Sequence, residues 1–116
     1  MISQPLKGLG TALVTPFLED GSLDTDGIHR LALRQIEHGV DFLVPCGTTG
    51  EAVTLSDDEY VTVLKTVVDA ASGRVPVIAG AGSNSTLKTI ETARKAVSCG
   101  VDGVLVVGPY YNKPTQ

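Results

Sequence analysis

The sequence has no tryptophan, few aromatic residues and no long apolar run. Only 4% of its 116 residues are aromatic, too few for a surface that stacks nucleic-acid bases. The net charge of −4 at pH 7 also argues against nucleic acid as a partner. No stretch of about 18 apolar residues is present, so no membrane-spanning segment is expected. Residues 1–10 lack the charged-then-apolar pattern of a signal peptide, which makes the cytoplasm the expected location.

Cysteine is scarce as well, and metal-binding spacing is lacking. Cys46 and Cys99 are the two cysteines, and they match no metal-site spacing. The sequence therefore predicts no metal and no other cofactor. Each cysteine lies in or beside an apolar segment, which predicts a buried thiol. Cys46 also precedes a polar turn, where a nucleophile could act, but no base is evident beside it.

Hydrophobic residues make up 42% of the chain, and they alternate between strand-like and helical patterns. Short, apolar, β-branched stretches predict strands at 9–14, 42–46, 75–80 and 103–107. Apolar residues at helical spacing predict three helices between them. These begin at Asp24, at Ser56, and at Asn84 or Ser85, and each ends before a glycine.

Local signals support the helices. Ser56 and Glu59 have the spacing of a capping box, and Gly39 follows the first helix as a C′ glycine. In the third helix the apolar side chains are expected to face the core. They are Leu87, Ile90, Ala93 and Val97.

Three strand–helix units followed by a strand predict an α/β fold with a parallel sheet. Apolar strands of this kind are typical of sheets that helices cover on both faces. The triplet Gly-Val-Asp recurs at 39–41 and 100–102, each time between a helix and a strand. Two architectures remain open, a doubly wound sheet and roughly the first half of a (β/α)₈ barrel. No linker divides the chain, so residues 1–116 are expected to belong to one domain.

Polar residues collect where the predicted strands end. In both architectures ligands bind beyond the carboxyl ends of the strands. Those ends carry Thr15 and Pro16, then residues 47–51, 80–84 and 108–111, all rich in glycine, hydroxyl or amide groups. The opposite turns look like plain connectors. This asymmetry predicts an active-site face.

The stretch Gly-Thr-Thr-Gly-Glu at 47–51 is the most informative of these turns. Gly47 and Gly50 are expected to adopt positive φ and to leave amides uncovered. Thr48 and Thr49 add two hydroxyls, and such a group of donors suits a small carboxylate or phosphate. The alternative is an ordinary tight turn in which threonine makes local hydrogen bonds.

Tyr110 and Tyr111 are adjacent after the last strand, so they point to different sides. One phenol can pack while the other reaches a neighbour or a ligand and passes protons along a hydroxyl chain. The alternative is that both pack, which is the simpler interpretation for Tyr110.

The turn at 47–51, together with Pro-Tyr-Tyr-Asn-Lys-Pro at 109–114, resembles the dihydrodipicolinate synthases, also called 4-hydroxy-tetrahydrodipicolinate synthases. Thr15-Pro16 and Val-Ile-Ala-Gly at 77–80 fit the same pattern, and the resemblance extends over essentially the whole chain. The resemblance implies a (β/α)₈ barrel, usually a homotetramer built as a dimer of dimers. It also implies a lyase in lysine and diaminopimelate biosynthesis. Such an enzyme condenses pyruvate, held as a lysine Schiff base, with L-aspartate 4-semialdehyde.

The resemblance also implies roles for individual residues. Thr48 would belong to a proton relay, and Thr49, with Gly47 and Thr48, would bind the carboxylate of pyruvate. Tyr111 would be the relay tyrosine that crosses into a neighbouring subunit's site.

Asn84 and Tyr110 match the family's lysine-feedback site. Lys88 stands where feedback-sensitive members usually have glutamate, and Asp57 where a histidine is usual. A cation at position 88 would repel the ammonium group of lysine, so weak or absent inhibition is expected.

One departure from the family pattern is large. The family's Schiff-base lysine lies on the sixth strand, and a carboxylate-binding arginine follows the fifth, but this chain carries four predicted strands. Its lysines are Lys7, Lys65, Lys88, Lys95 and Lys113. Only Lys113 is near the expected active-site face. The chain alone is therefore expected to lack the Schiff-base lysine and to be inactive.

Two alternatives remain at this point. Another pyruvate aldolase of the superfamily, such as an N-acetylneuraminate lyase or a sugar-acid aldolase, would share the threonine turn but not the Tyr-Tyr-Asn-Lys-Pro stretch. A small non-catalytic α/β module that binds an anion would belong to a different class. A finished module would normally have a helix covering the fourth strand, and none is predicted here.

Overall fold

The computed structural model describes residues 5–112, 114 and 115. In chain order its elements are β1 (Gly10–Ala12), α1 (Thr25–Glu37), β2 (Phe42–Val44), the 3₁₀ helix η1 (Ala52–Thr54), α2 (Asp57–Ala71), β3 (Ile78–Gly80), α3 (Thr86–Ser98) and β4 (Gly103–Leu105). The predicted order of strands and helices is confirmed, although the strands are shorter than predicted. None of the helices in the described part of the chain is long and apolar enough to cross a membrane.

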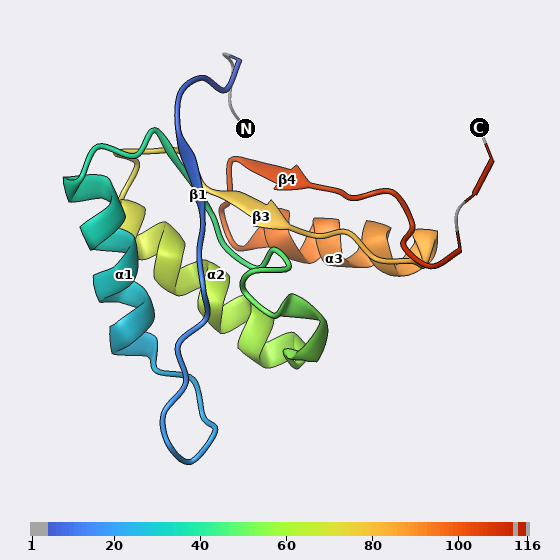
Figure 1. Cartoon of the computed structure of the whole chain (residues 1–116), viewed down its shortest axis with the longest axis horizontal. Helices are drawn as coiled ribbons and strands as arrows, with labels where there is room; N and C mark the ends of the chain where they lie inside the picture. The colour runs from blue at the N-terminus through green and yellow to red at the C-terminus, as the bar shows by residue number, and fades with distance from the viewer. Residues whose placement is uncertain (1–4, 113, 116) are drawn as a thin grey trace.

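The four strands are parallel and lie side by side in chain order. β1 pairs with β2, and β3 pairs with β4. Two backbone hydrogen bonds join these pairs, from Leu43 N to Pro76 O (3.0 Å) and from Gly80 N to Pro45 O (2.9 Å). The three α-helices lie on one side of the strands (Figure 1). Sequential strand order with helices on one side is the arrangement of a (β/α)₈ barrel. A doubly wound sheet would reverse its strand order and place helices on both faces.

The core lies between the strands and helices α1 and α2, which run beside each other (Figure 1). Burial of apolar side chains supplies the main favourable term in folding. The largest fully buried side chains are Ile28, Leu43, Pro45, Leu64, Val67 and Val77. They come from α1, from α2 and from the segments around β2 and β3. This packing holds the carboxyl ends of the strands in place.

Side-chain caps begin the helices as the sequence predicts. Ser56 Oγ accepts a hydrogen bond from Glu59 N (3.2 Å), and Glu59 Oε2 accepts one from Ser56 N (2.8 Å). Ser85 caps α3, and Gly39 has a φ of +87° after α1. Each cap satisfies backbone groups that the first or last turn leaves unpaired. The helix ends are therefore set by local chemistry.

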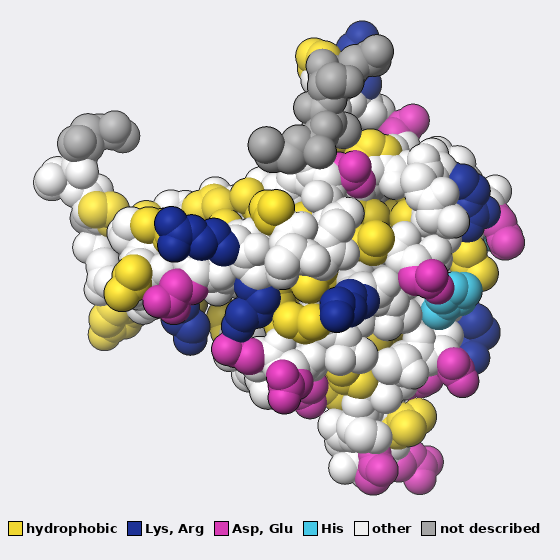
Figure 2. Space-filling view, turned by 180° about the vertical axis from the view of Figure 1, so that it is seen from behind, with side chains coloured by type: hydrophobic (Ala, Val, Ile, Leu, Met, Phe, Trp, Pro, Cys, Tyr) yellow, Lys and Arg dark blue, Asp and Glu magenta, His cyan; other side chains and the backbone are white. Residues whose placement is uncertain are grey.

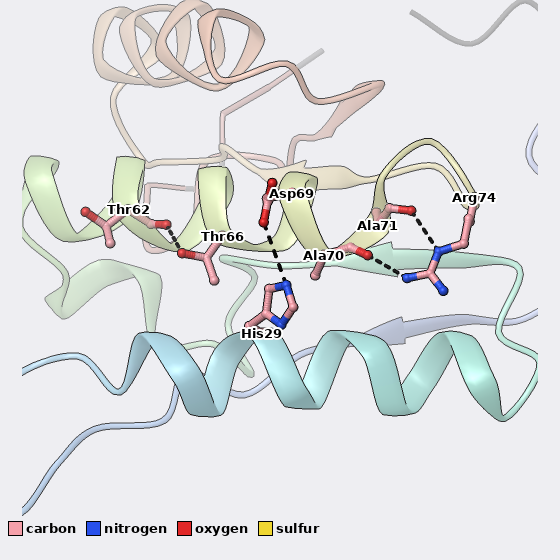
Figure 3. Close-up of polar contacts among 7 residues, drawn as sticks. All are labelled: His29, Thr62, Thr66, Asp69, Ala70, Ala71 and Arg74. Carbon is pink, nitrogen blue, oxygen red and sulfur yellow. Dashed lines mark hydrogen bonds and ion pairs between the residues drawn. The ribbon is translucent and has the colours of Figure 1, made fainter.

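Figure 3 shows polar contacts of α1 and α2, among which the pair of His29 and Asp69 joins the two helices. His29 Nε2 lies 3.7 Å from Asp69 Oδ2, with 40% and 83% of the two side chains exposed. The Arg74 guanidinium donates to Ala70 O (2.8 Å) and Ala71 O (3.3 Å), which satisfies carbonyls at the end of α2. An exposed ion pair contributes at most about 1 kcal/mol. Apolar packing therefore holds these two helices together.

The predicted inward orientation is wrong for three of the four apolar residues named on α3, while Ala93 is half-buried. Leu87, Ile90 and Val97 are 67%, 43% and 53% exposed, and Ala96 is the buried residue of this helix. Apolar side chains accordingly reach the surface over α3 (Figure 2). The helix packs on β4 and on one side of α2, and no described element covers its remaining apolar face. An amphipathic pattern identifies an apolar face but not what covers it.

Of the two architectures that the sequence left open, the exposure of strand-side residues favours the half barrel. Val14, Leu105 and Val107 are 54%, 52% and 47% exposed. These side chains are exposed because no described helix covers their side of the strands, which corresponds to the inward side of a barrel wall. Apolar strand composition is the same in both arrangements, so it did not distinguish them.

Candidate active site

Residues 47–51 form two successive hydrogen-bonded turns directly after β2. Gly50 N donates to Gly47 O (3.1 Å), and Glu51 N donates to Thr48 O (3.0 Å). Thr48 and Thr49 are exposed at the tip of the turn. Within the described chain, neither their amides nor their hydroxyls form a hydrogen bond. The turn therefore has two exposed threonines whose amides and hydroxyls have no described hydrogen-bond partner.

The predicted backbone geometry of this turn is wrong in one respect. Positive φ occurs at Cys46 (57°) and Glu51 (55°), on either side of the turn, and not at Gly47 or Gly50. Gly50 instead lies in a tight space, because a Cβ there would lie 3.0 Å from Leu13 O and 3.2 Å from Thr15 Oγ1. Non-glycine residues with positive φ store strain and are found where the surroundings determine the backbone. Here they reverse the chain at both ends of the threonine turn.

Thr15 fixes the turn from the neighbouring strand. Its side chain is 5% exposed, and its hydroxyl donates to Gly50 O at 2.7 Å. Thr15 follows β1, so the bond joins the carboxyl ends of β1 and β2. A site supported by buried hydrogen bonds keeps its geometry without a ligand. The threonine turn is therefore preorganised by the strand beside it.

The end of β3 packs against the backbone of residues 46 and 47, at the start of the threonine turn. A Cβ on Gly80 would overlap the carbonyl group of Cys46, so the two backbones are in direct contact. The Tyr60 hydroxyl, from α2, donates to Gly80 O at 2.8 Å. Burial raises the pKa of Tyr60, which keeps the phenol protonated as a donor. The carboxyl ends of β1, β2 and β3 thus form one continuous surface.

The loop after β4 carries the two tyrosines. Tyr111 is 96% exposed and has a φ of +70°, whereas Tyr110 is 43% exposed. Asn112 Nδ2 donates to Asn84 O at 3.3 Å, which holds this loop against the start of α3. Among the described residues no hydrogen bond joins Tyr111 to Thr48. Lys113, the lysine expected near the active-site face, lies outside the described residues.

A second feature is a cavity of about 140 Å³ between η1, the start of α2, the end of β3 and α3. Tyr110 lines it and Asn84 does not, although the adjacent Ser83 does. Two of its lining residues form an ion pair: Lys95 Nζ lies 2.6 Å from Oδ2 of the largely exposed Asp57, and this contact lowers the pKa of the Asp57 carboxyl. Sequence reasoning missed Lys95. Lys95 lies seven residues after Lys88 on the same helix, and this spacing could have indicated that the two side chains share one side of it.

Cys46 is a buried thiol, as predicted, and not a nucleophile at neutral pH. Its side chain is 2% exposed, and burial, with a smaller effect from nearby Cys99, raises its pKa to about 12. The thiolate is the reactive form of cysteine. Cys99 is buried as well, and the two cysteines are free.

The raised pKa of Cys46 predicts that alkaline pH destabilises the fold. In the unfolded chain the thiol ionises near its ordinary pKa of 9.0, whereas in the folded chain it stays neutral up to about 12. Between these values only the unfolded state loses the proton, so the free energy of unfolding falls as pH rises, by at most about 1.4 kcal/mol per pH unit.

Urea unfolding at a series of pH values from neutral to above the ordinary thiol pKa of 9.0 measures this slope. Cys46→Ala should have a shallower slope over the same range, since it lacks the thiol. Equal slopes in the two proteins would contradict the assignment.

Parallel strands in chain order, with helices on one side and polar turns at the carboxyl ends, define the class as a (β/α)₈-barrel enzyme fold. A model described as the Dihydrodipicolinate synthetase family matches residues 5–116. The chain belongs to this family.

Relatives extend well beyond the length of this chain. It is 56% identical over 117 residues to a 4-hydroxy-tetrahydrodipicolinate synthase of Sorangium cellulosum, covering 100% of this chain and 39% of the relative. It is 54% identical over 112 residues to one of Koribacter versatilis, covering 96% and 37%. The chain thus spans less than two fifths of the length of these relatives.

A solved structure gives the same match in three dimensions. The chloride-inhibited dihydrodipicolinate synthase of Acinetobacter baumannii, crystallised with pyruvate, superposes with a TM-score of 0.92 at 45% identity, covering 96% of this chain and 38% of that one.

Proposed function

We propose that residues 1–116 form the N-terminal half of the catalytic barrel of a 4-hydroxy-tetrahydrodipicolinate synthase. This lyase condenses pyruvate with L-aspartate 4-semialdehyde, in the cytoplasm, on the route to diaminopimelate and lysine. Family membership over residues 5–116 supports the assignment, and so does the relative crystallised with pyruvate. The observation that carries it is the preorganised turn whose two threonines expose unpaired donors.

Pyruvate would bind at this turn through its carboxylate. The amide and hydroxyl of Thr49 supply donors, with Thr48 beside them, and both residues are exposed. At Gly47 nothing lies within 4 Å of the position a Cβ would take, so the backbone there leaves room for a ligand. Hydrogen bonds to an ionised acceptor are about twice as strong as neutral ones. The turn would therefore orient the keto group toward the reacting lysine.

Thr48 and Tyr111 would move protons during the reaction. A threonine hydroxyl both donates and accepts, which a relay requires. Tyr111 is 96% exposed and forms no hydrogen bond to Thr48 among the described residues, so within one chain the pair does not meet. A phenol that extends from the surface is suited to complete the site of a partner subunit. We therefore place this phenol at a subunit contact of the homotetramer, a dimer of dimers, that the family resemblance implies.

The covalent step needs a reactive lysine, and we infer that none of the described lysines serves as one. A Schiff base forms when an unprotonated amine attacks the keto carbon and water leaves, and burial or a neighbouring cation promotes loss of the amine proton. Lys7, Lys65 and Lys88 are exposed, and Lys95 is held in an ion pair with Asp57. We expect the 116-residue chain to form no imine with pyruvate.

Borohydride reduction in the presence of pyruvate, followed by mass analysis, tests this expectation. The full-length product of the same gene, treated in parallel, should gain one pyruvyl group and serves as the positive control. A stable pyruvyl adduct on a lysine of the 116-residue chain would contradict the prediction.

The activity itself is tested on the full-length protein with pyruvate and L-aspartate 4-semialdehyde, by following formation of the condensed product. Replacing the semialdehyde with an N-acetylated aldose distinguishes an N-acetylneuraminate lyase. Turnover of pyruvate with the aldose but not with the semialdehyde would overturn the proposed acceptor.

A further inference from the structure

The threonine turn, residues 47–51, is held mainly by hydrogen bonds between near neighbours in the sequence. Gly50 N donates to Gly47 O (3.1 Å), and Glu51 O accepts a hydrogen bond from the Thr54 hydroxyl (2.9 Å). Both bonds join residues three positions apart. Bonds of this range fix the shape of a turn, but they do not fix its orientation relative to the strands around it.

One hydrogen bond connects the turn to a distant part of the chain. The hydroxyl of Thr15, which follows β1, donates to Gly50 O at 2.7 Å across 35 positions of sequence. Among the described residues, no other hydrogen bond joins the turn to a segment more than five positions away. The Thr15 hydroxyl is therefore the directional contact that orients the turn relative to β1.

The backbone at both ends of the turn needs such a contact. Cys46 and Glu51 have φ of 57° and 55°, a conformation that non-glycine residues keep only where their surroundings determine it. Thr48 and Thr49 lie between these two residues. Relaxation of φ at either end would rotate both threonines away from their present positions.

Thr15 is itself held in place on both sides. Leu13 N, two positions earlier, donates to Val44 O (3.0 Å), and Asp24 N donates to Pro16 O (3.0 Å), directly after Thr15. The Thr15 side chain is 5% exposed, and it is the one polar side chain among the buried residues of the described chain. A buried hydroxyl is costly unless it is hydrogen-bonded, so this one is expected to stay on the Gly50 carbonyl.

Loss of this hydroxyl would displace the turn as well as free it. In Thr15→Val a methyl group takes the place of the oxygen that now lies 2.7 Å from Gly50 O. A carbon atom rarely approaches a carbonyl oxygen closer than about 3.3 Å, so the turn would have to move by roughly half an ångström or more. Binding and catalytic groups generally need to be held within about 0.5 Å of their productive positions.

We propose that Thr15 is a positioning residue for pyruvate. Its hydroxyl holds the turn, through Gly50 O, at the place from which Thr49 binds the carboxylate and Thr48 moves a proton. Thr15 is buried, so its effect is exerted through the turn and not by contact with the substrate. This inference rests on the function proposed above for the turn.

Steady-state kinetics of full-length Thr15→Val tests the proposal. Its kcat/KM for pyruvate should fall by about 10- to 100-fold, the effect of a displacement approaching 1 Å. Both a lower kcat and a higher KM are expected, because Thr48 and Thr49 move together. Thr66→Val is the matched control, since it removes a half-buried hydroxyl that donates to Thr62 O (2.8 Å) on α2 (Figure 3), and it should keep the kinetics of the parent protein.

Thr15→Ser separates positioning from stability. It keeps the donor but loses a buried methyl group, so it should unfold at a lower urea concentration than the parent. Its kcat/KM for pyruvate should nevertheless stay within about threefold of the parent, far less than a misplaced group costs. A purely structural role would instead make the activity of both Thr15 variants follow their stability.

Hydrogen–deuterium exchange of the same proteins without substrate gives a readout that does not depend on activity. Peptides covering the turn should exchange faster in Thr15→Val than in the parent, and at the parental rate in Thr15→Ser, while peptides from α1 and α2 stay unchanged. Thr15→Ala, which also lacks the hydroxyl, replaces Thr15→Val if valine prevents folding.

Parental kinetics or parental exchange at the turn in Thr15→Val, with an active parent protein, would overturn this inference and leave the proposed function intact. Equal losses of kcat/KM in Thr15→Val and Thr15→Ser would overturn it as well. A parent protein that forms no product from pyruvate would overturn the proposed function and this inference together.

Discussion

Thr48→Val in the full-length protein should lower kcat by about 10²- to 10⁴-fold, the range that a positioned proton-transfer group contributes. Valine keeps the shape of threonine and removes the hydroxyl. The Thr48 side chain is exposed and forms no hydrogen bond with a described residue, so its loss should change stability by less than about 0.5 kcal/mol. A large kinetic effect without a change in Tm would identify a residue that acts in the reaction.

Steady-state kinetics with pyruvate as the varied substrate measures this effect. Three further variants serve as a rescue, a comparison and a control. Thr48→Ser restores a hydroxyl and should recover most of the activity. Thr49→Val should mainly raise the KM for pyruvate, because a carboxylate contact is made in both the ground state and the transition state. Thr62→Val removes a hydroxyl that donates to Asp58 O at a half-buried position of α2, outside the threonine turn, and should keep the kcat and KM of the parent protein. A kcat for Thr48→Val within about threefold of the parent, far less than general acid–base catalysis contributes, would remove Thr48 from the relay.

Gly80→Ala should destabilise the chain by about 3 kcal/mol or more, at the upper end of what overpacking costs. The new Cβ would lie 2.6 Å from the carbonyl carbon of Cys46, and backbone cannot move aside as a flexible side chain can. Relief would require β2 and β3 to separate. Separation would break the bond from Gly80 N to Pro45 O and the one from the Tyr60 hydroxyl to Gly80 O.

Urea denaturation followed by circular dichroism measures this loss, and Gly108→Ala is the matched control. At Gly108 nothing lies within 4 Å of the position a Cβ would take, and φ is not positive, so alanine fits there. The control should unfold within about 0.5 kcal/mol of the parent, as is usual for surface changes. Equal stabilities of the two variants would show that β2 and β3 are not in the close contact described.

Much of this architecture follows from short-range signals in the sequence. The caps at Ser56 and Ser85 and the glycine after α1 depend on residues a few positions apart, so their chemistry can be recognised without a fold. The alternation of apolar strands with amphipathic helices predicted the parallel α/β class for the same reason. The motifs at 47–51 and 109–114 carried the family resemblance, and the match over residues 5–116 confirms it.

Three features could be decided only by tertiary structure. Positive φ falls on Cys46 and Glu51 because the chain must reverse where β2 meets the ends of its neighbours, and Thr15 secures Gly50 across 35 positions of sequence. The apolar side of α3 is exposed because no described element packs on it.

The cavity between α2 and α3 is the third feature. It forms only when the two helices approach each other, which also brings Lys95 to Asp57. Local sequence determines which elements form, because helix and strand signals act between near neighbours. How the ends of those elements meet depends on contacts between distant residues, and that geometry decides where a ligand can bind.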